Sequence, residues 1–341
     1  MRRGNQDAPF LATALGRRAA RRPLWIMRQA GRYLPEYRAV REQFSFLELC
    51  KSPVAATEVT LQPIERFDLD AAILFTDLLI PIEAMGVGLT YEPGPVLANT
   101  VTTMADVEAL AVLDPATDLT PMLDTVSLVR ERLAEDKALI GFVGAPFTLA
   151  CYMIEGRGSK NWDRVRKMMF AQPRLFEALL ERLTVCLQPL VGALVERGCD
   201  AVQTFDSWAN VLSPEDYATR CAPRTDRLLQ TARDAGGVAI NYVNGAAQHM
   251  PIMAESCAHV LGFDWRVSMA DARATARDDQ TLQGNMDPAG LYASESELRR
   301  MVRAVCDAAG PDRHIFNLGH GILPDVDPDA LTVVADEVRS K

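Results

Sequence analysis

The sequence predicts an α/β protein of the (β/α)₈ barrel class, folded as a single domain. Eight short apolar or β-branched segments recur along the 341 residues, each ending in a polar or glycine-containing turn. Most of them lack the alternation of a half-exposed strand, which suits strands buried on both faces of a parallel sheet. Amphipathic helical stretches separate them, and a repeated strand–helix order is typical of this barrel.

We expect the eight strands, in chain order, at residues 24–27, 71–75, 138–143, 201–205, 238–243, 259–263, 281–284 and 314–318. Helices are expected near 121–135 and over 173–197, 214–235 and 295–309. The wide interval after the second strand holds 87–92 and 93–97, which we predict as a hairpin. An open doubly wound sheet is the alternative, but its first turn would carry G-x-G-x-x-G, and residues 28–32 do not.

Residues 1–22 are predicted as an N-terminal helical extension, with a surface helix over 10–20. This stretch is rich in arginine, but Asp7 interrupts it and no long apolar run follows, so we do not expect a targeting sequence. We also expect no apolar run long enough to span a membrane.

Composition narrows the classes of protein that fit. The formal net charge of -9 and the pI near 5.1 argue against a nucleic-acid or membrane-surface partner. Seven scattered cysteines form no Cys-x-x-Cys pair, which favours a reducing cytoplasm over a disulfide framework. The four histidines form no His-x-x-x-His pair, so we predict no metal site.

Polar and charged residues follow the expected strands at the points where each strand ends. In a barrel these carboxyl ends meet at one face, where chemistry takes place. The strand ends deliver cations, a carboxylate, hydroxyls and an imidazole, namely Arg28, Arg32, Asp77, Ser207 and His320. Guanidinium groups grip carboxylates in pairs of hydrogen bonds, so the arginines indicate a polycarboxylate ligand. Gly31 would allow a tight turn that brings backbone N–H groups close to it.

Each of these residues also has a structural interpretation. The arginines could pair with nearby carboxylates, and Asp77 could cap the next helix. His320, between two glycines, could be a satisfied structural histidine, Tyr152 a core side chain and Ser207 an N-cap. The segment 156–160 lacks the spacing of a phosphate-binding loop, so we do not predict nucleotide binding.

The chain closely resembles the uroporphyrinogen decarboxylase family from Pro23 to Pro324. The segments that carry the resemblance are Met27-Arg28-Gln29-Ala30-Gly31-Arg32-Tyr33-Leu34-Pro35-Glu36-Tyr37, Phe75-Thr76-Asp77, Gly141-Phe142-Val143-Gly144-Ala145-Pro146-Phe147-Thr148-Leu149-Ala150 and Asn317-Leu318-Gly319-His320-Gly321-Ile322. Two positions depart from the family pattern where glycine is common, Arg157 and Asn210, and they put loop mobility in question.

The resemblance implies a cytoplasmic, homodimeric (β/α)₈ enzyme of haem and porphyrin biosynthesis without metal or organic cofactor. It would remove the four acetate carboxyl groups of uroporphyrinogen III to give coproporphyrinogen III and CO₂. Carried onto this chain, catalysis falls on Asp77 and Arg28. Substrate binding falls on Arg28, Gln29, Ala30, Gly31, Arg32, Asp77, Tyr152, Ser207 and His320. Arg38 lies beyond Pro35 and is left out of the site.

A mechanism without a cofactor follows from the chemistry of the expected substrate. A pyrrole protonated at its α-carbon accepts the electrons released with CO₂, so the substrate supplies its own electron sink. Asp77 would accept pyrrole N–H bonds and stabilise the cationic intermediate. Arg28 and Arg32 would hold carboxylates, and the proton donor stays open, although Arg28 is one candidate.

Two other functions are weighed against this one. Similar barrels transfer methyl groups from corrinoid proteins with zinc held by His-x-Cys and a distant Cys, a pattern that all four histidines here lack. A non-catalytic tetrapyrrole carrier would need the arginines but could dispense with Asp77.

Overall fold

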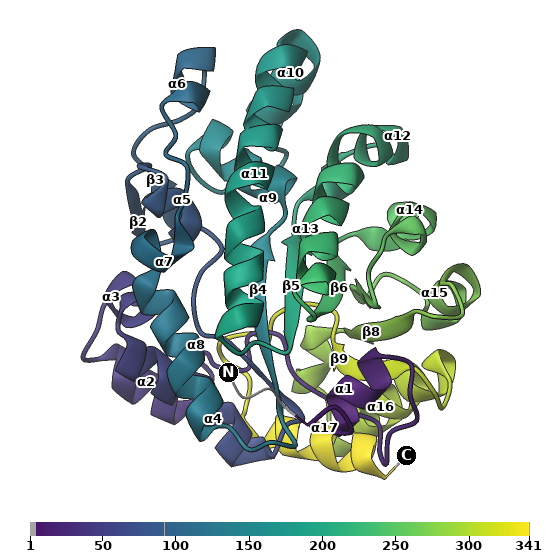
Figure 1. Cartoon of the computed structure of the whole chain (residues 1–341). Coiled ribbons are helices and arrows are strands. Elements are labelled where there is room, and N and C mark those ends of the chain that lie inside the picture. Colours follow the sequence, from purple (N-terminus) through teal and green to yellow (C-terminus); the bar gives the residue numbers. More distant parts are fainter. Residues whose placement is uncertain (1–4, 92, 341) are drawn as a thin grey trace.

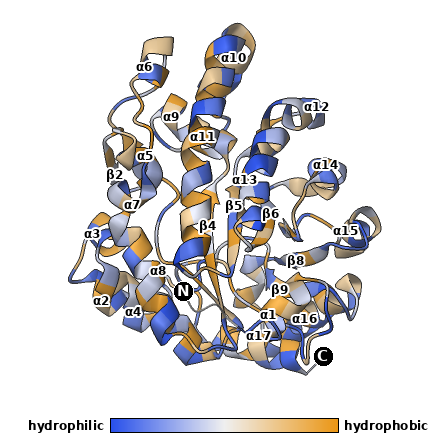
Figure 2. Cartoon of the chain, viewed as in Figure 1, coloured by the Kyte–Doolittle hydropathy of each residue, from blue (hydrophilic) through white to orange (hydrophobic). Residues whose placement is uncertain are grey.

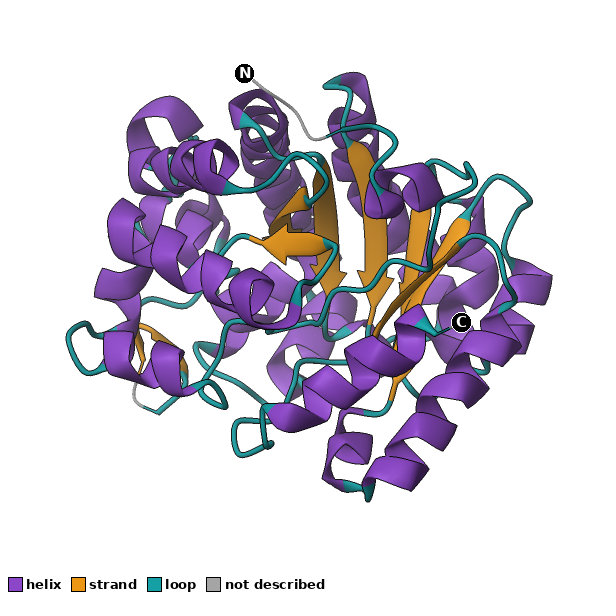
Figure 3. Ribbon diagram, turned by 90° about the horizontal axis from the view of Figure 1, so that it is seen from below, coloured by secondary structure: helices purple, strands orange, loops and turns teal. Residues whose placement is uncertain are grey.

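Seven parallel strands form one curled sheet that helices surround (Figures 1 and 3). The computed structural model describes residues 5–91 and 93–340. Neighbouring strands follow chain order around the sheet: β1 (Ala71–Ile73), β4 (Ala138–Gly144), β5 (Ala201–Asp206), β6 (Val238–Val243), β7 (Val260–Phe263), β8 (Thr281–Met286) and β9 (His314–Leu318). These strands confirm seven of the eight predicted segments.

The first predicted strand, 24–27, is not assigned as a strand of the sheet; Leu24 forms a single parallel bridge with Phe316 of β9. Side chains replace the sheet partners of its backbone. The N–H groups of Leu24, Ile26 and Met27 donate to Asp70 Oδ2 (3.0 Å), Gln29 Oε1 (3.0 Å) and Asn317 Oδ1 (2.9 Å), as the hydrogen bonds show. The segment still lies beside β9, because Trp25 N–H donates to the Phe316 carbonyl.

Helices pack outside the sheet and on its ends. They are α1 (Pro9–Ala14), α2 (Pro35–Arg41), α3 (Phe46–Lys51), α4 (Pro53–Phe67), α5 (Ile80–Ala84), α6 (Met104–Glu108), α7 (Pro115–Asp118), α8 (Thr120–Arg132), α9 (Pro146–Glu155), α10 (Asp163–Ala171), α11 (Pro173–Arg197), α12 (Pro214–Asp216), α13 (Ala222–Asp234), α14 (Met250–Glu255), α15 (Met269–Thr275), α16 (Glu295–Ala309) and α17 (Asp329–Arg339). The bounds of α11 and α16 match the prediction, and α8 fits the helix expected near 121–135.

The helix predicted over 214–235 is interrupted. A π-helical turn at Tyr217–Cys221 separates α12 from α13. Pro223 stands just after it and has no N–H, so the carbonyl one turn earlier loses its helical partner and the backbone widens locally. The predicted hairpin is confirmed as antiparallel β2 (Leu89–Tyr91) and β3 (Pro95–Leu97), while Glu92 lies outside the described residues.

The predicted N-terminal surface helix is wrong in both length and burial. Helix α1 ends before Gly16, whose left-handed backbone (φ 70°) stops it, and residues 1–4 lie outside the described part of the chain. Phe10 and Leu11 are almost fully buried. They share a core cluster with the first residues of the sheet strands, among them Ala138 and Ala201. Thus α1 covers the amino end of the sheet.

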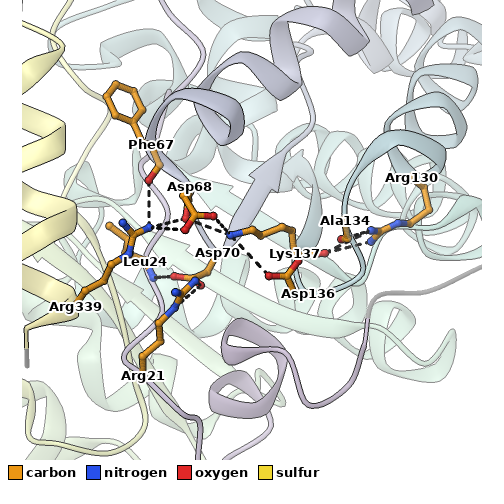
Figure 4. A network of polar contacts seen from close by, with 10 residues as sticks. All are labelled: Arg21, Leu24, Phe67, Asp68, Asp70, Arg130, Ala134, Asp136, Lys137 and Arg339. Carbon is orange, nitrogen blue, oxygen red and sulfur yellow. Dashed lines mark hydrogen bonds and ion pairs between the residues drawn. The ribbon is translucent and has the colours of Figure 1, made fainter.

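Buried charges at this amino end are paired (Figure 4). Asp70, immediately before β1, accepts from Arg21 at 2.7 Å. Asp200, immediately before β5, accepts from Arg130 at 2.9 Å. Lys137, before β4, pairs with Asp68. The carboxylates that open these strands are therefore neutralised within the protein.

Helix α11 carries the long apolar surface of the outer layer. By length and composition alone it could cross a membrane, although no segment of the sequence was expected to be apolar and long enough to do so. Buried side chains recur along it from Leu175 to Val195, and bands of both polarities alternate on its surface (Figure 2). Over half of its most apolar window, 56%, is buried inside the protein, as expected for a core helix.

Candidate active site

Three of the predicted site residues lie within reach of the charge of Arg28. Its guanidinium lowers the pKa of Asp77, Tyr152 and His320, although burial is the larger influence on each. These three residues come from the loop after β1, the helix after β4 and the loop after β9. Segments far apart in sequence therefore deliver one cation, one carboxylate, one phenol and one imidazole to the carboxyl end of the sheet.

Arg28 has an unusual backbone for its residue type. Its φ of 63° lies in the left-handed region, which costs a non-glycine residue about 1–2 kcal/mol. Its side chain is exposed, and no hydrogen bond or ion pair joins its guanidinium to the rest of the described chain. The side chain packs over Gly321, where an added Cβ would lie 2.3 Å from Arg28 Cδ. A strained arginine with an unsatisfied fork is suited to an anionic ligand.

The rest of the 28–32 loop plays a different part from the one its sequence suggests. Gln29 is fully buried, and its side-chain amide binds Ile26 N–H and the Ala71 carbonyl. Ala30 and Gly31 are half-buried. The left-handed residue is Arg28, not Gly31, whose value is its lack of a side chain, because a Cβ there would meet the Arg28 carbonyl at 3.0 Å.

The two other arginines of this segment differ from Arg28. Arg32 is exposed, without an ion pair to any described residue, and its charge lowers the pKa of Tyr37 as a minor influence. The structure does not link Arg32 electrostatically to Asp77 or His320. Arg38 donates to the carbonyls of Arg32 and Tyr33 and so clamps the loop, in keeping with its omission from the predicted site.

Asp77 is a half-buried carboxylate without a cationic partner among the described residues. Its Oδ1 accepts the backbone N–H of Leu79 at 2.9 Å. Burial raises the pKa of Asp77, and the Tyr91 hydroxyl, the Leu79 N–H and the charge of Arg28 oppose that shift in this order. Leu79, not Asp77, is the N-cap of α5. The carboxylate is therefore poised to gain stability from ligand N–H groups or positive charge.

Tyr152 and Ser207 flank the same region. Burial raises the pKa of Tyr152 to about 12, so its hydroxyl keeps its proton at neutral pH and can donate. The ring packs against Trp162 and Trp208 at centroid distances of 5.4 and 6.2 Å. Ser207 is fixed at the end of β5, where its N–H donates to Thr148 Oγ1 at 2.8 Å.

His320 is held as a neutral hydrogen-bond donor. Burial, with the charges of Arg28 and Arg266, lowers its pKa to about 4. Its Nδ1 accepts the N–H of Gly321 at 2.8 Å, so in the neutral ring the proton belongs on Nε2. The flanking glycines admit close neighbours: a Cβ at Gly319 would lie 2.3 Å from the Trp265 backbone N.

Sequence reasoning gave no role to several residues here. Tyr91 lies beside Asp77, but its hairpin docks through tertiary packing that no local pattern encodes. Tyr242 donates to the Gly319 carbonyl at 2.8 Å, and its inward place on β6 could have been inferred from strand alternation. Asp206 is fully buried with Oδ2 unpaired, and burial raises its pKa to about 7.

The two departures from the family pattern are fixed in the fold. Arg157 forms an isolated antiparallel bridge with Val96 of the hairpin. Asn210 lies in a short 3-10 helix, Ala209–Val211, and packs against Gly245, where an added Cβ would come within 2.3 Å of Asn210 Cβ. In the described ranges, no group of three or more His, Cys, Asp or Glu residues is arranged to hold a metal ion.

The fold and the site define an α/β protein that gathers an arginine, a carboxylate, a phenol and an imidazole at the carboxyl ends of a curled parallel sheet. Comparisons with known proteins agree on its family. The profile described as "Uroporphyrinogen decarboxylase (URO-D)" matches residues 5–341. The chain is 45% identical over 331 residues to a uroporphyrinogen decarboxylase of Trichlorobacter lovleyi (97% of both chains). It is 46% identical over 321 residues to that of Geobacter sulfurreducens (94% of both). The chain therefore belongs to the uroporphyrinogen decarboxylase family, as the sequence predicted.

Solved structures of other activities share the fold. A methyltransferase from Methanosarcina mazei superposes with a TM-score of 0.82 over 99% of both chains, at 17% identity. A B12-independent methionine synthase from Shewanella superposes with a TM-score of 0.62 over 94% of this chain and 95% of that one, at 12% identity. At these identities the likeness concerns the fold alone.

Proposed function

We propose that the chain is a carboxy-lyase that removes the four acetate carboxyl groups of uroporphyrinogen III without a cofactor, giving coproporphyrinogen III and CO₂ in porphyrin and haem biosynthesis. The observation that carries the proposal is that the charge of Arg28, whose backbone is left-handed and whose guanidinium has no ion pair to a described residue, acts on Asp77, a half-buried carboxylate that also has no ion pair to a described residue. Family membership supplies the substrate, since the relatives named above are uroporphyrinogen decarboxylases.

Asp77 acts on the pyrrole N–H groups and on the charge that develops in the ring. Protonation of a pyrrole α-carbon makes the ring cationic, after which the acetate C–C bond breaks, CO₂ leaves and its electron pair neutralises the ring. A second proton on the exocyclic carbon, with loss of the first from the ring, completes the methyl group. Because burial disfavours a lone Asp77 carboxylate, a cation beside it is stabilised strongly.

The other residues bind and orient the substrate. Arg28 and Arg32 hold carboxylates, with Ala30 and Gly31 giving them room, while Gln29 acts indirectly by bracing the loop from below. Tyr152, Ser207 and neutral His320 donate hydrogen bonds to other polar atoms of the ring substituents. Arg28 is a poor acid unless bound substrate perturbs it, so its role in proton delivery is secondary to holding carboxylates.

The finer architecture belongs to the same proposal. Residues 24–27 would serve as the eighth strand, since backbone bonds join Trp25 to Phe316 and Asp70 to Leu24 on either side. The whole of 1–341 would then be one (β/α)₈ domain with an N-terminal extension over about 1–22. A cytoplasmic homodimer without nucleic-acid or membrane partners fits the acidic composition and the family.

The direct test is anaerobic incubation of the purified protein with uroporphyrinogen III, with carboxyl loss followed by chromatography of the oxidised products. We expect successive seven-, six-, five- and four-carboxyl species and release of CO₂. Products that retain all eight carboxyl groups would overturn the proposed activity and favour a tetrapyrrole carrier.

A further inference from the structure

The loops that follow β6 and β7 are fastened around one fully buried carboxylate, Asp264. Its Oδ2 accepts the N–H groups of Gly245 (2.7 Å) and Ala246 (3.0 Å). Its Oδ1 accepts the backbone N–H and the Nε of Arg266, at 3.0 and 2.6 Å. Four donors thus converge on Asp264, and they fix the start of the Arg266 side chain at the carboxyl end of the sheet.

Two further contacts fix the guanidinium of Arg266. Its Nη2 donates to Asn244 Oδ1 at 2.6 Å, and its plane lies over the Trp265 ring, 4.6 Å from the centroid. The third nitrogen, Nη1, has no hydrogen bond to a described residue, and the side chain is 46% exposed. A guanidinium held on three sides with one edge open loses little entropy when that edge binds a ligand.

This open edge belongs to the same site as Arg28. The Trp265 backbone packs on Gly319, and the Arg28 side chain packs on Gly321, so the two arginine-bearing segments lie on the two glycines that flank His320. The Trp265 and His320 ring centroids are 6.4 Å apart. Both arginine charges lower the pKa of His320, after burial. The site therefore has a further guanidinium, that of Arg266, which the family resemblance did not assign.

We propose that Arg266 is a further substrate-binding residue, whose Nη1 edge holds a carboxylate that the substrate keeps throughout the reaction. This inference rests on the proposed function. A guanidinium stabilises a carboxylate as an anion, and a carboxyl group must lose that charge to leave as CO₂, so gripping it would slow its loss. A rigid cation is better matched to a propionate. Because Asp264 balances its charge, Arg266 contributes a directional hydrogen bond more than a long-range field.

The test compares Arg266→Gln and Arg266→Lys with wild type, and uses Arg300→Gln as the matched control. Arg300 lies on the outer helix α16 and pairs with Glu297. For Arg266→Gln we expect KM for uroporphyrinogen III to rise about tenfold, the size of a lost charge-assisted hydrogen bond, with kcat within twofold. The inhibition constant of coproporphyrinogen III, which has only retained carboxylates, should rise by the same factor. Lysine should restore part of the loss, and Arg300→Gln should change nothing.

Unchanged KM and inhibition constant in Arg266→Gln would overturn the inference, as would a fall in kcat with unchanged KM. If glutamine prevents folding, the lysine variant decides, since it keeps a cation beside Asp264 but lacks the fork. If wild type releases no CO₂, the proposed function fails instead. Fluorescence titration with uroporphyrin I, a stable octacarboxylate, then still reads the Arg266 contribution: weaker binding in Arg266→Gln supports it, and equal binding overturns it.

Discussion

The aspartates at the amino ends of strands β1 and β5 have different partners from the aspartates at the carboxyl ends. Asp70 and Asp200, at the amino ends, each accept from an arginine and from a backbone N–H. At the carboxyl ends, Asp77 accepts the Leu79 N–H with the Tyr91 hydroxyl beside it, and Asp206 accepts the Thr148 hydroxyl, but neither carboxylate has an ion-pair partner among the described residues. A carboxylate that is paired with an arginine inside the protein stabilises the fold, whereas a carboxylate with few partners can act on a ligand.

The largest effect on stability is expected at the amino end of β5. Asp200→Ala would leave Arg130 buried without its carboxylate, so we expect the free energy of unfolding to fall by about 3–5 kcal/mol. Urea denaturation measures the loss, and kcat/KM of the folded enzyme should stay within twofold. Asp200→Asn, which keeps an acceptor, should lose less. A change below about 1 kcal/mol would show that the pair does not support the fold.

At the carboxyl end of β5, Asp206 should make the stability of the protein depend on pH. Burial raises the pKa of Asp206 from 3.8 to about 7. Below pH 4 the Asp206 carboxyl is largely protonated in both the folded and the unfolded protein, so folding does not have to neutralise a charge there. As pH rises from 4 to 7 the unfolded carboxyl ionises first, so the free energy of unfolding falls by up to about 4 kcal/mol and then levels off.

Asp206→Asn keeps the bond to Thr148 and removes this ionisation. We expect it to raise the melting temperature at pH 8 and to leave it nearly unchanged at pH 4. Calorimetry at both values provides the measurement, with Asp278→Asn, at an exposed carboxylate, as a control for surface charge. An equal effect of Asp206→Asn at the two pH values would mean that Asp206 ionises normally in the folded protein.

At the carboxyl end, Arg28→Gln should affect activity rather than stability. The guanidinium has no partner to lose among the described residues, and its left-handed backbone is no better for glutamine. We expect kcat/KM to fall about 10- to 100-fold, which corresponds to about 1.4–2.8 kcal/mol of substrate contacts. Steady-state assays and thermal unfolding report the two properties. A large loss of stability with normal turnover would assign Arg28 to the structural class.

The smallest effect is expected from Arg21→Gln at the amino end of β1. Arg21 is one-third exposed, and Asp70 keeps its bond to the Leu24 N–H, so unfolding should become easier by about 1 kcal/mol. Chemical denaturation at low and high salt provides the measurement, with kcat/KM unchanged. A loss of stability as large as that of Asp200→Ala would mean that partial exposure does not weaken the ion pair between Arg21 and Asp70.

The sequence was sufficient for the strand ends but not for their surroundings. Asp77, Ser207 and His320 could be grouped in advance because the carboxyl ends of parallel strands meet at one face, whereas Tyr152 was assigned only by the family resemblance. The segment 24–27 reads as a strand, but the side chains of Asp70, Gln29 and Asn317 bind its N–H groups from distant or folded-back positions. A local sequence pattern does not show that distant side chains will take the place of a neighbouring strand as hydrogen-bond partners.

Other misses have the same physical origin. The apolar residues of α1 predict one buried face, but they do not say that this face covers the end of the sheet. Tyr91 reaches Asp77 only because the β2–β3 hairpin docks beside α3, where its ring lies 4.7 Å from Phe46. The left-handed backbone of Arg28 has no signal in residue type, since such positions usually favour glycine. These features depend on tertiary contacts.

In the proposed mechanism, Asp77 acts directly upon the substrate. Asp77→Asn keeps the size of the side chain and removes its charge, so its single-turnover rate of carboxyl loss from uroporphyrinogen III, measured anaerobically by chromatography, is the most direct test. We predict a rate about 10²- to 10³-fold below wild type, with a melting temperature equal to or above it, because a cation-free buried carboxylate is removed. A rate within tenfold of wild type in a folded Asp77→Asn variant would contradict the proposal that the Asp77 carboxylate stabilises the reacting substrate.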